Sequence, residues 1–233
     1  MGLSTRIVKQ NRNSGRSKAS SLDKWTLILL SSNLVYWSRS EVACGANLTA
    51  RNLGYRFLCF DCYDSAQLEE ECLQTILRGN VAGVLLICSD DTKNLPLCQQ
   101  VARKIPTVQV IASHPLIGAD RVAVDEYAGG YLIMEHLVRL GYRRIGHVTF
   151  DIDTSPVSDR EKAYRDYMVK AHLPVSNQWI LQLPDSLYHK DPVHRKPWLQ
   201  KFLQSRARPS AVFAQADRLA SGFTALWNEF TII

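Results

Sequence analysis

Several polar residues follow the apolar segments of this sequence at the points where strands would end. They are Ser31, Ser32, Asp125, Arg160 and Asp217. Arginine offers a planar fork of hydrogen-bond donors and aspartate offers acceptors, so together they suit a ligand with many hydroxyl groups. Any one of them alone has the simpler interpretation of a helix cap or a surface charge. Their shared position favours a binding site, because open α/β sheets bind small ligands beyond the carboxyl ends of their strands.

The standard catalytic motifs are missing from the sequence. It contains no glycine-rich phosphate loop, no nucleophile elbow and no zinc-protease helix motif. The pair Glu135-His136 is typical of a surface or packing position, and Asp90-Asp91 of a helix cap. We therefore expect no catalytic residue, no metal site and no cofactor, and we expect that the chain is not an enzyme.

Two of the six cysteines, Cys59 and Cys62, have the Cys-x-x-Cys spacing of redox and zinc sites. No second pair follows at a zinc-site interval, and the alternation of a strand would send the two side chains to opposite faces. Free cysteines usually behave as small buried apolar residues. The thiols therefore indicate a reduced, cytoplasmic setting rather than a metal.

Short apolar runs that alternate with amphipathic stretches predict the elements that position the polar residues. We expect strands at 25–30, 55–60, 81–87, 107–111, 122–124, 145–150, 179–183 and 211–214, most of them followed by a helix. Such alternation is typical of parallel sheets with right-handed crossovers. The stretch 122–150 reads as one strand–helix–strand unit, with Asp125 at the end of its first strand and a stop at Gly141.

Composition and charge are those of a globular chain with a basic head. The 233 residues suffice for one large domain or two lobes, and the apolar runs are too short to cross a bilayer. Residues 1–24 hold six basic side chains and one acid, so they carry five of the six net positive charges. Such a head is typical of a solvated tail or linker, or alternatively of a segment that contacts nucleic-acid phosphates.

Three blocks of the sequence, in this order, resemble the effector-binding domain of LacI/GalR-type transcription regulators. They are Val122-x-x-Asp125-Glu126-x-x-Gly129-Gly130, then Asp159-Arg160-x-x-Ala163-Tyr164, then Asp217-x-x-Ala220-x-Gly222. The resemblance extends over residues 25–227. It implies an α/β fold of the periplasmic-binding-protein-like type I, with two Rossmann-like lobes built on parallel sheets.

The same resemblance implies a function and a site. The chain would bind a sugar or another small polar effector between its lobes, and the bound effector would change the affinity of the regulator for DNA. Asp125 would contact the effector from the first lobe, and Arg160 and Asp217 from the second. The sequence departs from the family at Ala163, where Gly is usual, and at Ala216, where Asn is usual.

We expect a head at 1–24, an N-terminal lobe at 25–144 and a partial C-terminal lobe at 145–233. The head is too short for a helix-turn-helix domain, and the family continues beyond the last helix, so we expect an incomplete second lobe. DNA would then be contacted only through a missing or separate DNA-binding domain. We also expect a homodimer in the cytoplasm, with no membrane association.

Two alternatives remain at this point. The first is an extracytoplasmic sugar-binding protein of a transport system, which shares the fold but would need a secretory signal that the sequence does not show. The second is an enzyme on the same scaffold, since a fold does not determine a function.

Overall fold

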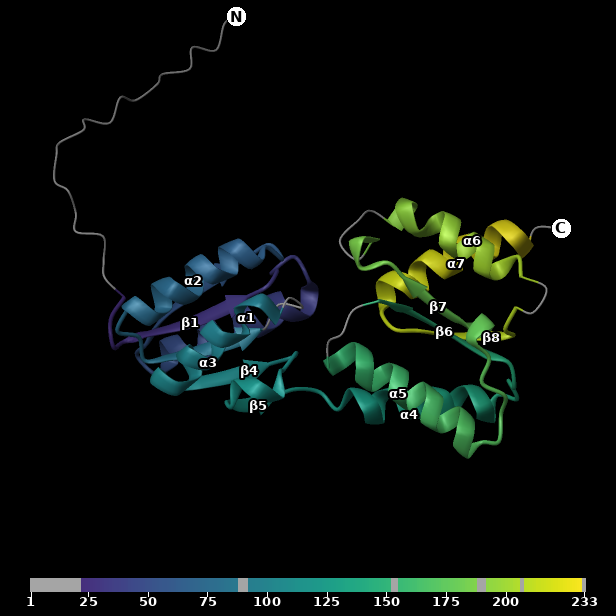
Figure 1. The fold of residues 1–233 in the computed structure, drawn as a ribbon, viewed down its shortest axis with the longest axis horizontal. Helices are drawn as coiled ribbons and strands as arrows, with labels where there is room; N and C mark the ends of the chain where they lie inside the picture. Colours follow the sequence, from purple (N-terminus) through teal and green to yellow (C-terminus); the bar gives the residue numbers. More distant parts are fainter. Residues whose placement is uncertain (1–21, 88–91, 152–154, 188–191, 206–207, 232–233) are drawn as a thin grey trace, which may run out of the picture.

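A computed structural model describes residues 22–87, 92–151, 155–187, 192–205 and 208–231 of the chain. The basic head lies almost wholly outside these residues. The described chain forms two parallel sheets, one of five strands and one of three, and each sheet is covered by helices (Figure 1). The expected α/β class with two lobes and parallel sheets is confirmed.

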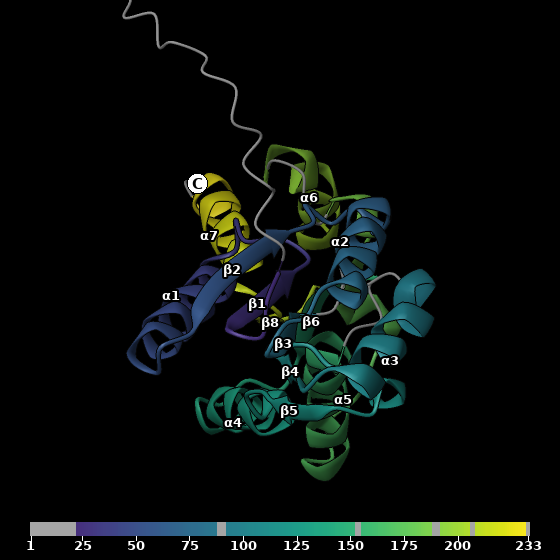
Figure 2. The ribbon, with the colours of Figure 1, turned by 90° about the vertical axis from the view of Figure 1, so that its left-hand side faces the viewer.

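The first lobe is built on a sheet with the strand order β2-β1-β3-β4-β5. Its strands are β1 (Thr26–Ser31), β2 (Arg56–Asp61), β3 (Gly83–Ile87), β4 (Thr107–Val110) and β5 (Asp120–Val122), and its helices are α1 (Trp37–Asn52), α2 (Ala66–Arg78) and α3 (Leu95–Lys104). Helix α1 covers one face of the sheet, and α2 and α3 cover the other (Figure 2). Strand β1 is apolar throughout because it is buried on both faces: Ile28 and Leu30 face α2, and Leu29 faces α1.

The second lobe is built on a sheet with the order β7-β6-β8. Its strands are β6 (Ile145–Phe150), β7 (Ile180–Leu183) and β8 (Ala211–Ala214), and its helices are α4 (Glu126–Arg139), α5 (Ser155–Lys170), α6 (Lys196–Leu203) and α7 (Asp217–Thr231). Helices α4 and α5 cover one face, where Met134 packs with Ile145 and Tyr164. Helices α6 and α7 cover the other face, where Leu199 and Phe223 pack on Val148.

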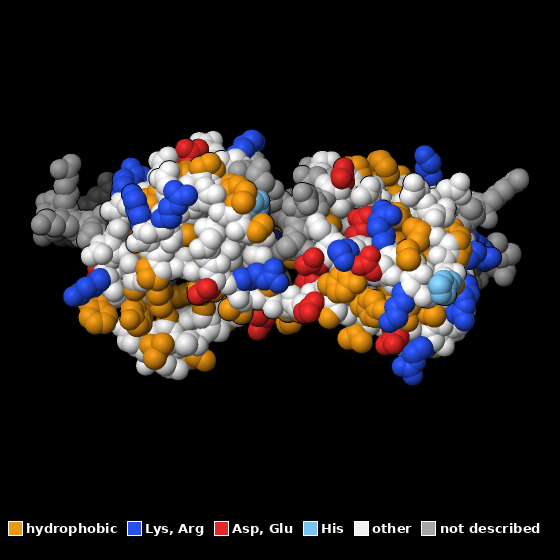
Figure 3. Space-filling view, turned by 60° about the horizontal axis from the view of Figure 1, so that its bottom comes forward, with side chains coloured by type: hydrophobic (Ala, Val, Ile, Leu, Met, Phe, Trp, Pro, Cys, Tyr) orange, Lys and Arg blue, Asp and Glu red, His pale blue; other side chains and the backbone are white. Residues whose placement is uncertain are grey.

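The position of α4 differs from what the sequence led us to expect. Strand β5 lies at the edge of the first sheet and β6 in the middle of the second, so residues 122–150 do not form a strand–helix–strand unit within one sheet. Helix α4 packs in the second lobe, whereas the expected boundary at residue 145 would place it in the first. The described chain passes between the lobes once, through residues 123–125. On the face that Figure 3 presents, the outline of the molecule narrows between the two lobes on its lower side.

Helices α4 and α5 approach each other closely at Gly130. A β-carbon built on Gly130 would lie 2.9 Å from the Cβ of Ala163 and 3.5 Å from the Cα of Arg160. A larger residue at 130 would therefore push the two helices apart. This close approach fixes the position of Arg160, one of the expected ligand contacts.

Candidate ligand-binding site

In each sheet the strand order reverses at one strand, so the crossover helices on either side of that strand lie on opposite faces of the sheet. In the first lobe this strand is β1, which lies between β2 and β3, and in the second it is β6, which lies between β7 and β8. Open α/β sheets bind ligands just beyond the carboxyl ends of the strands at such a point. Figure 1 shows that α1, which follows β1, starts on the side of the first lobe nearest the second, and that α7, which follows β8, starts on the side nearest the first. The carboxyl ends of the two sheets at these strands therefore face each other.

The first-lobe edge carries two buried hydroxyl groups. Ser31 is 0% and Ser32 2% exposed. Within the described part of the chain, the Oγ atoms of both serines lack a hydrogen-bond partner. Buried polar groups are nearly always paired, and an unpaired one destabilises a fold by about 1–3 kcal/mol. Two such groups at the end of β1 are therefore consistent with a site that a polar ligand completes.

The loop after β2 lies beside these serines and is held by Asp61 and Asp64. The Oδ1 atom of Asp61 accepts hydrogen bonds from the backbone N–H groups of Leu34 and Tyr63, both at 3.2 Å. Asp64 accepts from the side-chain amide of Asn33. Tyr63 and Asp64 both have positive φ, at 49° and 57°, a conformation that non-glycine residues adopt at some energetic expense. The loop presents the exposed ring of Tyr63 at the carboxyl end of the sheet.

In the second lobe, Arg160 joins three elements. Its Nε and Nη2 atoms lie 2.7 and 2.6 Å from Oε2 of Glu126, at the start of α4. Its Nη1 donates to the carbonyl oxygen of Gln215, just after β8, at 2.7 Å. Arg160 itself lies on α5. Since the guanidinium is planar and rigid, these bonds fix the orientation of its remaining donor positions.

Gln215 is a further candidate, which the sequence alone did not single out. It is 7% exposed, and its Oε1 accepts from the hydroxyl of Thr149 and from the backbone N–H of Phe150 at 3.1 Å. Its amide nitrogen makes no hydrogen bond with any residue that the structure describes. The amide of Gln215 thus lies one residue before Ala216, the position where the resemblance had led us to expect an asparagine. Its position directly after a strand is the same signal that pointed to Asp217.

The two aspartates of the expected site have different surroundings. Asp217 is the first residue of α7 and is exposed, and its carboxylate has no ion pair or hydrogen bond with the described residues. Asp125 is also exposed, but its Oδ1 accepts from the N–H of Ala128 at 2.8 Å and so caps α4. The structure thus brings Arg160 and Asp217 together around the end of β8 and places Asp125 in a capping position. The ligand roles of these residues and of Ser32 remain predictions.

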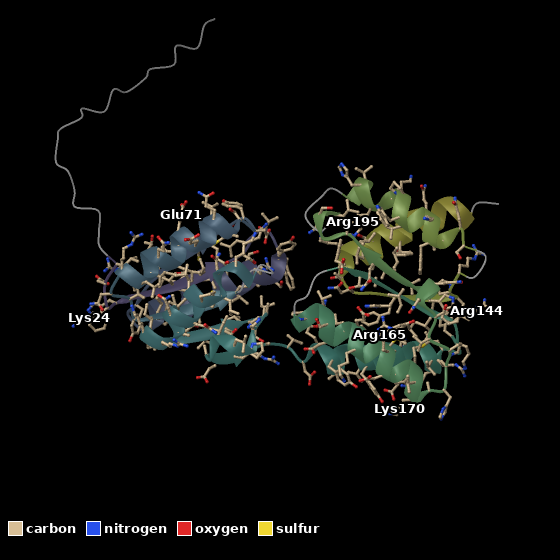
Figure 4. The ribbon with its side chains drawn as sticks, viewed as in Figure 1. Lys24, Glu71, Arg144, Arg165, Lys170 and Arg195 are labelled. Atoms are coloured by element: carbon tan, nitrogen blue, oxygen red, sulfur yellow. The ribbon has the colours of Figure 1, made fainter. Side chains whose placement is uncertain are left out.

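Arg195 is a second residue that the sequence did not single out. It is 1% exposed, its Nε donates to the carbonyl of Leu187 at 3.1 Å, and its guanidinium carbon lies 5.4 Å from the centre of the Phe150 ring. Figure 4 shows Arg195 on the side of the second lobe nearest the first. Only the tertiary fold buries this guanidinium, so no local pattern could have identified it.

The cysteine pair has the separation that the sequence predicted. Cys59 is exposed on β2, whereas Cys62 is 1% exposed in the core on the other face of the sheet. Burial is the main cause that raises the pKa of the Cys62 thiol, and the neighbouring Cys72 contributes to the rise. Among the described residues, no group of three or more His, Cys, Asp or Glu side chains could hold a metal ion.

Two α/β lobes whose strand ends face each other across a single described connection define the class of two-lobed binding proteins. The sequence profile described as "Periplasmic binding proteins and sugar binding domain of LacI family" matches residues 23–230. The chain belongs to this family, as its sequence blocks indicated.

Curated relatives and solved structures agree with this assignment. The ribose operon repressor of Haemophilus influenzae is 26% identical over 183 residues, which are 78% of this chain and 53% of the repressor. The repressor PurR of Salmonella paratyphi B is 26% identical over 200 residues, 84% of this chain and 56% of PurR. The chain thus spans about half the length of the curated relatives it matches.

A solved complex of the transcriptional regulator CelR with cellobiose shares the fold. Its TM-score is 0.74 at 18% identity, over 91% of this chain and 64% of CelR. In the described residues, no helix has both the length and the apolar character needed to span a membrane.

Proposed function

We propose that this chain is the ligand-sensing part of a LacI-type transcription regulator and that it binds a sugar or a similar polar effector between its lobes. The proposal rests on one observation: each lobe has polar residues at the carboxyl ends of its strands, and these two edges face each other. Ser31 and Ser32 offer hydroxyls from the first lobe that have no partner among the described residues, and Arg160, Gln215 and Asp217 offer donors and acceptors from the second. A polyhydroxylated ligand, which both donates and accepts, matches this mixture.

The relatives support a regulator over the two alternatives. Both curated relatives described above are named as repressors, and neither is a transport protein or an enzyme. The CelR structure is named as a complex with cellobiose, which supports a carbohydrate as the effector class. A cytoplasmic location follows from a regulatory role on DNA.

Contact with DNA would require a separate DNA-binding segment. On the face shown in Figure 3, basic and acidic side chains are interspersed over both lobes, whereas contact with DNA phosphates calls for a basic patch or stripe.

Homodimerisation is part of the same proposal. Helix α1 supports it, because Trp37 and Leu48 are 78% and 64% exposed on its surface.

The experiment that tests the function is isothermal titration calorimetry of the full chain with D-ribose and with cellobiose. We expect saturable binding of at least one neutral carbohydrate, weakened by Asp217→Asn and by Ser32→Ala. Ser176→Ala, which changes a serine that caps the turn before β7, serves as the control. Heat signals no larger than those of dilution for both sugars would contradict a carbohydrate effector.

A further inference from the structure

Tyr36 and Arg218 contact each other across the two lobes. Tyr36 precedes the first turn of α1, and Arg218 lies in the first turn of α7. The guanidinium carbon of Arg218 is 5.5 Å from the centre of the Tyr36 ring, and that of Arg39 is 4.7 Å from the same ring. Both distances are within the range of cation–π attraction.

Each partner belongs to a packed part of its own lobe. On the first-lobe side, the buried side chain of Arg39 lies against Tyr36, pairs with Asp64 at 3.8 Å and donates to the carbonyl oxygen of Asn33 at 3.4 Å. On the second-lobe side, the residue after Arg218, Leu219, is 0% exposed in the core beneath α7. The contact therefore joins the packed parts of the two lobes, and it would be lost if they separated.

The contact lies beside the candidate site. Arg218 directly follows Asp217, and Tyr36 lies on the loop that begins at Ser32. One chain segment, 123–125, joins the lobes in the described part, so the backbone restrains their relative orientation at one place only. Where two arrangements differ little in free energy, even a weak contact shifts the balance between them.

We propose that the Tyr36–Arg218 contact is a latch that favours the arrangement in which the two strand-end edges face each other. The relevance of the latch to sensing rests on the proposed function, but the latch itself does not. An exposed cation–π contact changes the ratio of two arrangements by about two- to fivefold.

The test measures the distance between the lobes in the full chain without ligand. Spin labels are placed at Thr49→Cys on α1 and Lys201→Cys on α6, both exposed positions, after the exposed Cys44 and Cys59 have been changed to serine. Pulsed electron–electron double resonance then gives the distribution of distances between the labels. Arg218→Ala and Tyr36→Leu should each enrich the longer distances about two- to fivefold. Tyr36→Phe, which keeps the aromatic ring, should resemble the parent.

The matched control is Arg144→Ala, which removes an exposed arginine at the far end of the same lobe (Figure 4). The control should leave the distribution unchanged. Identical distributions for the parent and Arg218→Ala would overturn the latch, as would an equal change in Arg144→Ala. Since no sugar is present, a failure of carbohydrate binding in calorimetry leaves this result unaffected, and the reverse also holds.

Discussion

The carboxylate of Glu126 lies 2.6 Å from Nη2 of Arg160. This ion pair links α4 to α5, and the further bond from Arg160 to Gln215 links both helices to the end of β8. An expected ligand contact is therefore also part of the framework of its lobe. Substitution of Arg160 should therefore affect stability as well as the proposed binding, which distinguishes it from Asp217.

Asp217→Asn should separate these two effects. Asp217 is exposed and has no partner among the described residues, so the substitution should change the free energy of unfolding of the chain by no more than about 0.5 kcal/mol. Its loss should still weaken carbohydrate binding by about 1.5–3 kcal/mol, the contribution of one charged hydrogen bond. Arg160→Ala should lower stability by about 1–3 kcal/mol as well as affinity. Urea denaturation and calorimetry measure the two quantities, and equal destabilisation by both variants would contradict this distinction.

Replacing either of two adjacent glycines on α4 by alanine should change stability, but in opposite directions. A methyl group on Gly130 would meet Ala163 at 2.9 Å, so Gly130→Ala should destabilise the second lobe by about 1–3 kcal/mol. A methyl group on Gly129 would meet nothing within 4 Å, and Gly129→Ala should raise stability by about 0.5–1 kcal/mol because alanine favours the helix. Thermal unfolding of the two variants provides the comparison. A stabilised Gly130→Ala protein would show that the helices do not approach as described.

Acid should destabilise the fold through His147, at the centre of β6. Its ring stacks on Tyr164 with centroids 5.2 Å apart, and Nδ1 lies 3.1 Å from the carbonyl oxygen of Phe213. Burial is the main cause that lowers the pKa of His147 from 6.5 to about 4. As the pH falls, the unfolded chain therefore takes up this proton before the folded chain does. The contribution of neutral His147 to the free energy of unfolding is fully present above pH 6.5 and is lost as the pH falls towards 4. This shift in pKa corresponds to a contribution of about 3 kcal/mol to the free energy of unfolding.

The measurement for His147 is urea denaturation at several pH values between 7 and 4. His147→Phe should lose most of the slope in this interval, whatever its stability at pH 7. His136→Gln, which changes an exposed histidine on α4, is the matched control and should keep the slope of the parent. A parent and a His147→Phe variant with the same slope would rule out His147 as the source.

Thiol labelling should distinguish the two cysteines of the Cys-x-x-Cys motif. Cys62 is buried and its pKa is raised by burial, so it should react only when the first lobe unfolds, because thiol reagents attack the thiolate. Cys44 and Cys59 are exposed and should react in the native chain, with Cys59 slowed by its own raised pKa. Mass spectrometry of labelled peptides assigns the sites. Rapid labelling of Cys62 in the native chain would contradict its position in the core.

The sequence predicted most of the elements because its local patterns determine them. Apolar runs such as 145–150 and helix boundaries such as Gly141 depend on neighbouring residues only. It did not predict that α4 would pack in the second lobe, since a strand–helix–strand pattern looks the same whether the second strand joins the same sheet or begins another. That distinction depends on which helix faces are complementary, and here it depends on the close approach of Gly130 to Ala163.

The candidate site was predictable to a similar degree. Polar residues after strands can be identified from sequence, and Ser32 and Asp217 lie at the facing edges as that rule requires. The capping role of Asp125 and the bond between Arg160 and Glu126 depend on side-chain geometry. Arg195 and Tyr36 could not be selected, because their contacts join residues far apart in the chain.

The single passage of the described chain through residues 123–125 has a consequence for denaturation experiments. Among the described residues, each lobe has its own buried core, and no buried apolar cluster includes residues of both lobes. Cooperativity requires shared contacts, so the two lobes should melt as separate units, and one midpoint cannot describe the whole chain. The acid sensitivity of His147 should then appear in only one of two transitions, which would show which transition belongs to the second lobe.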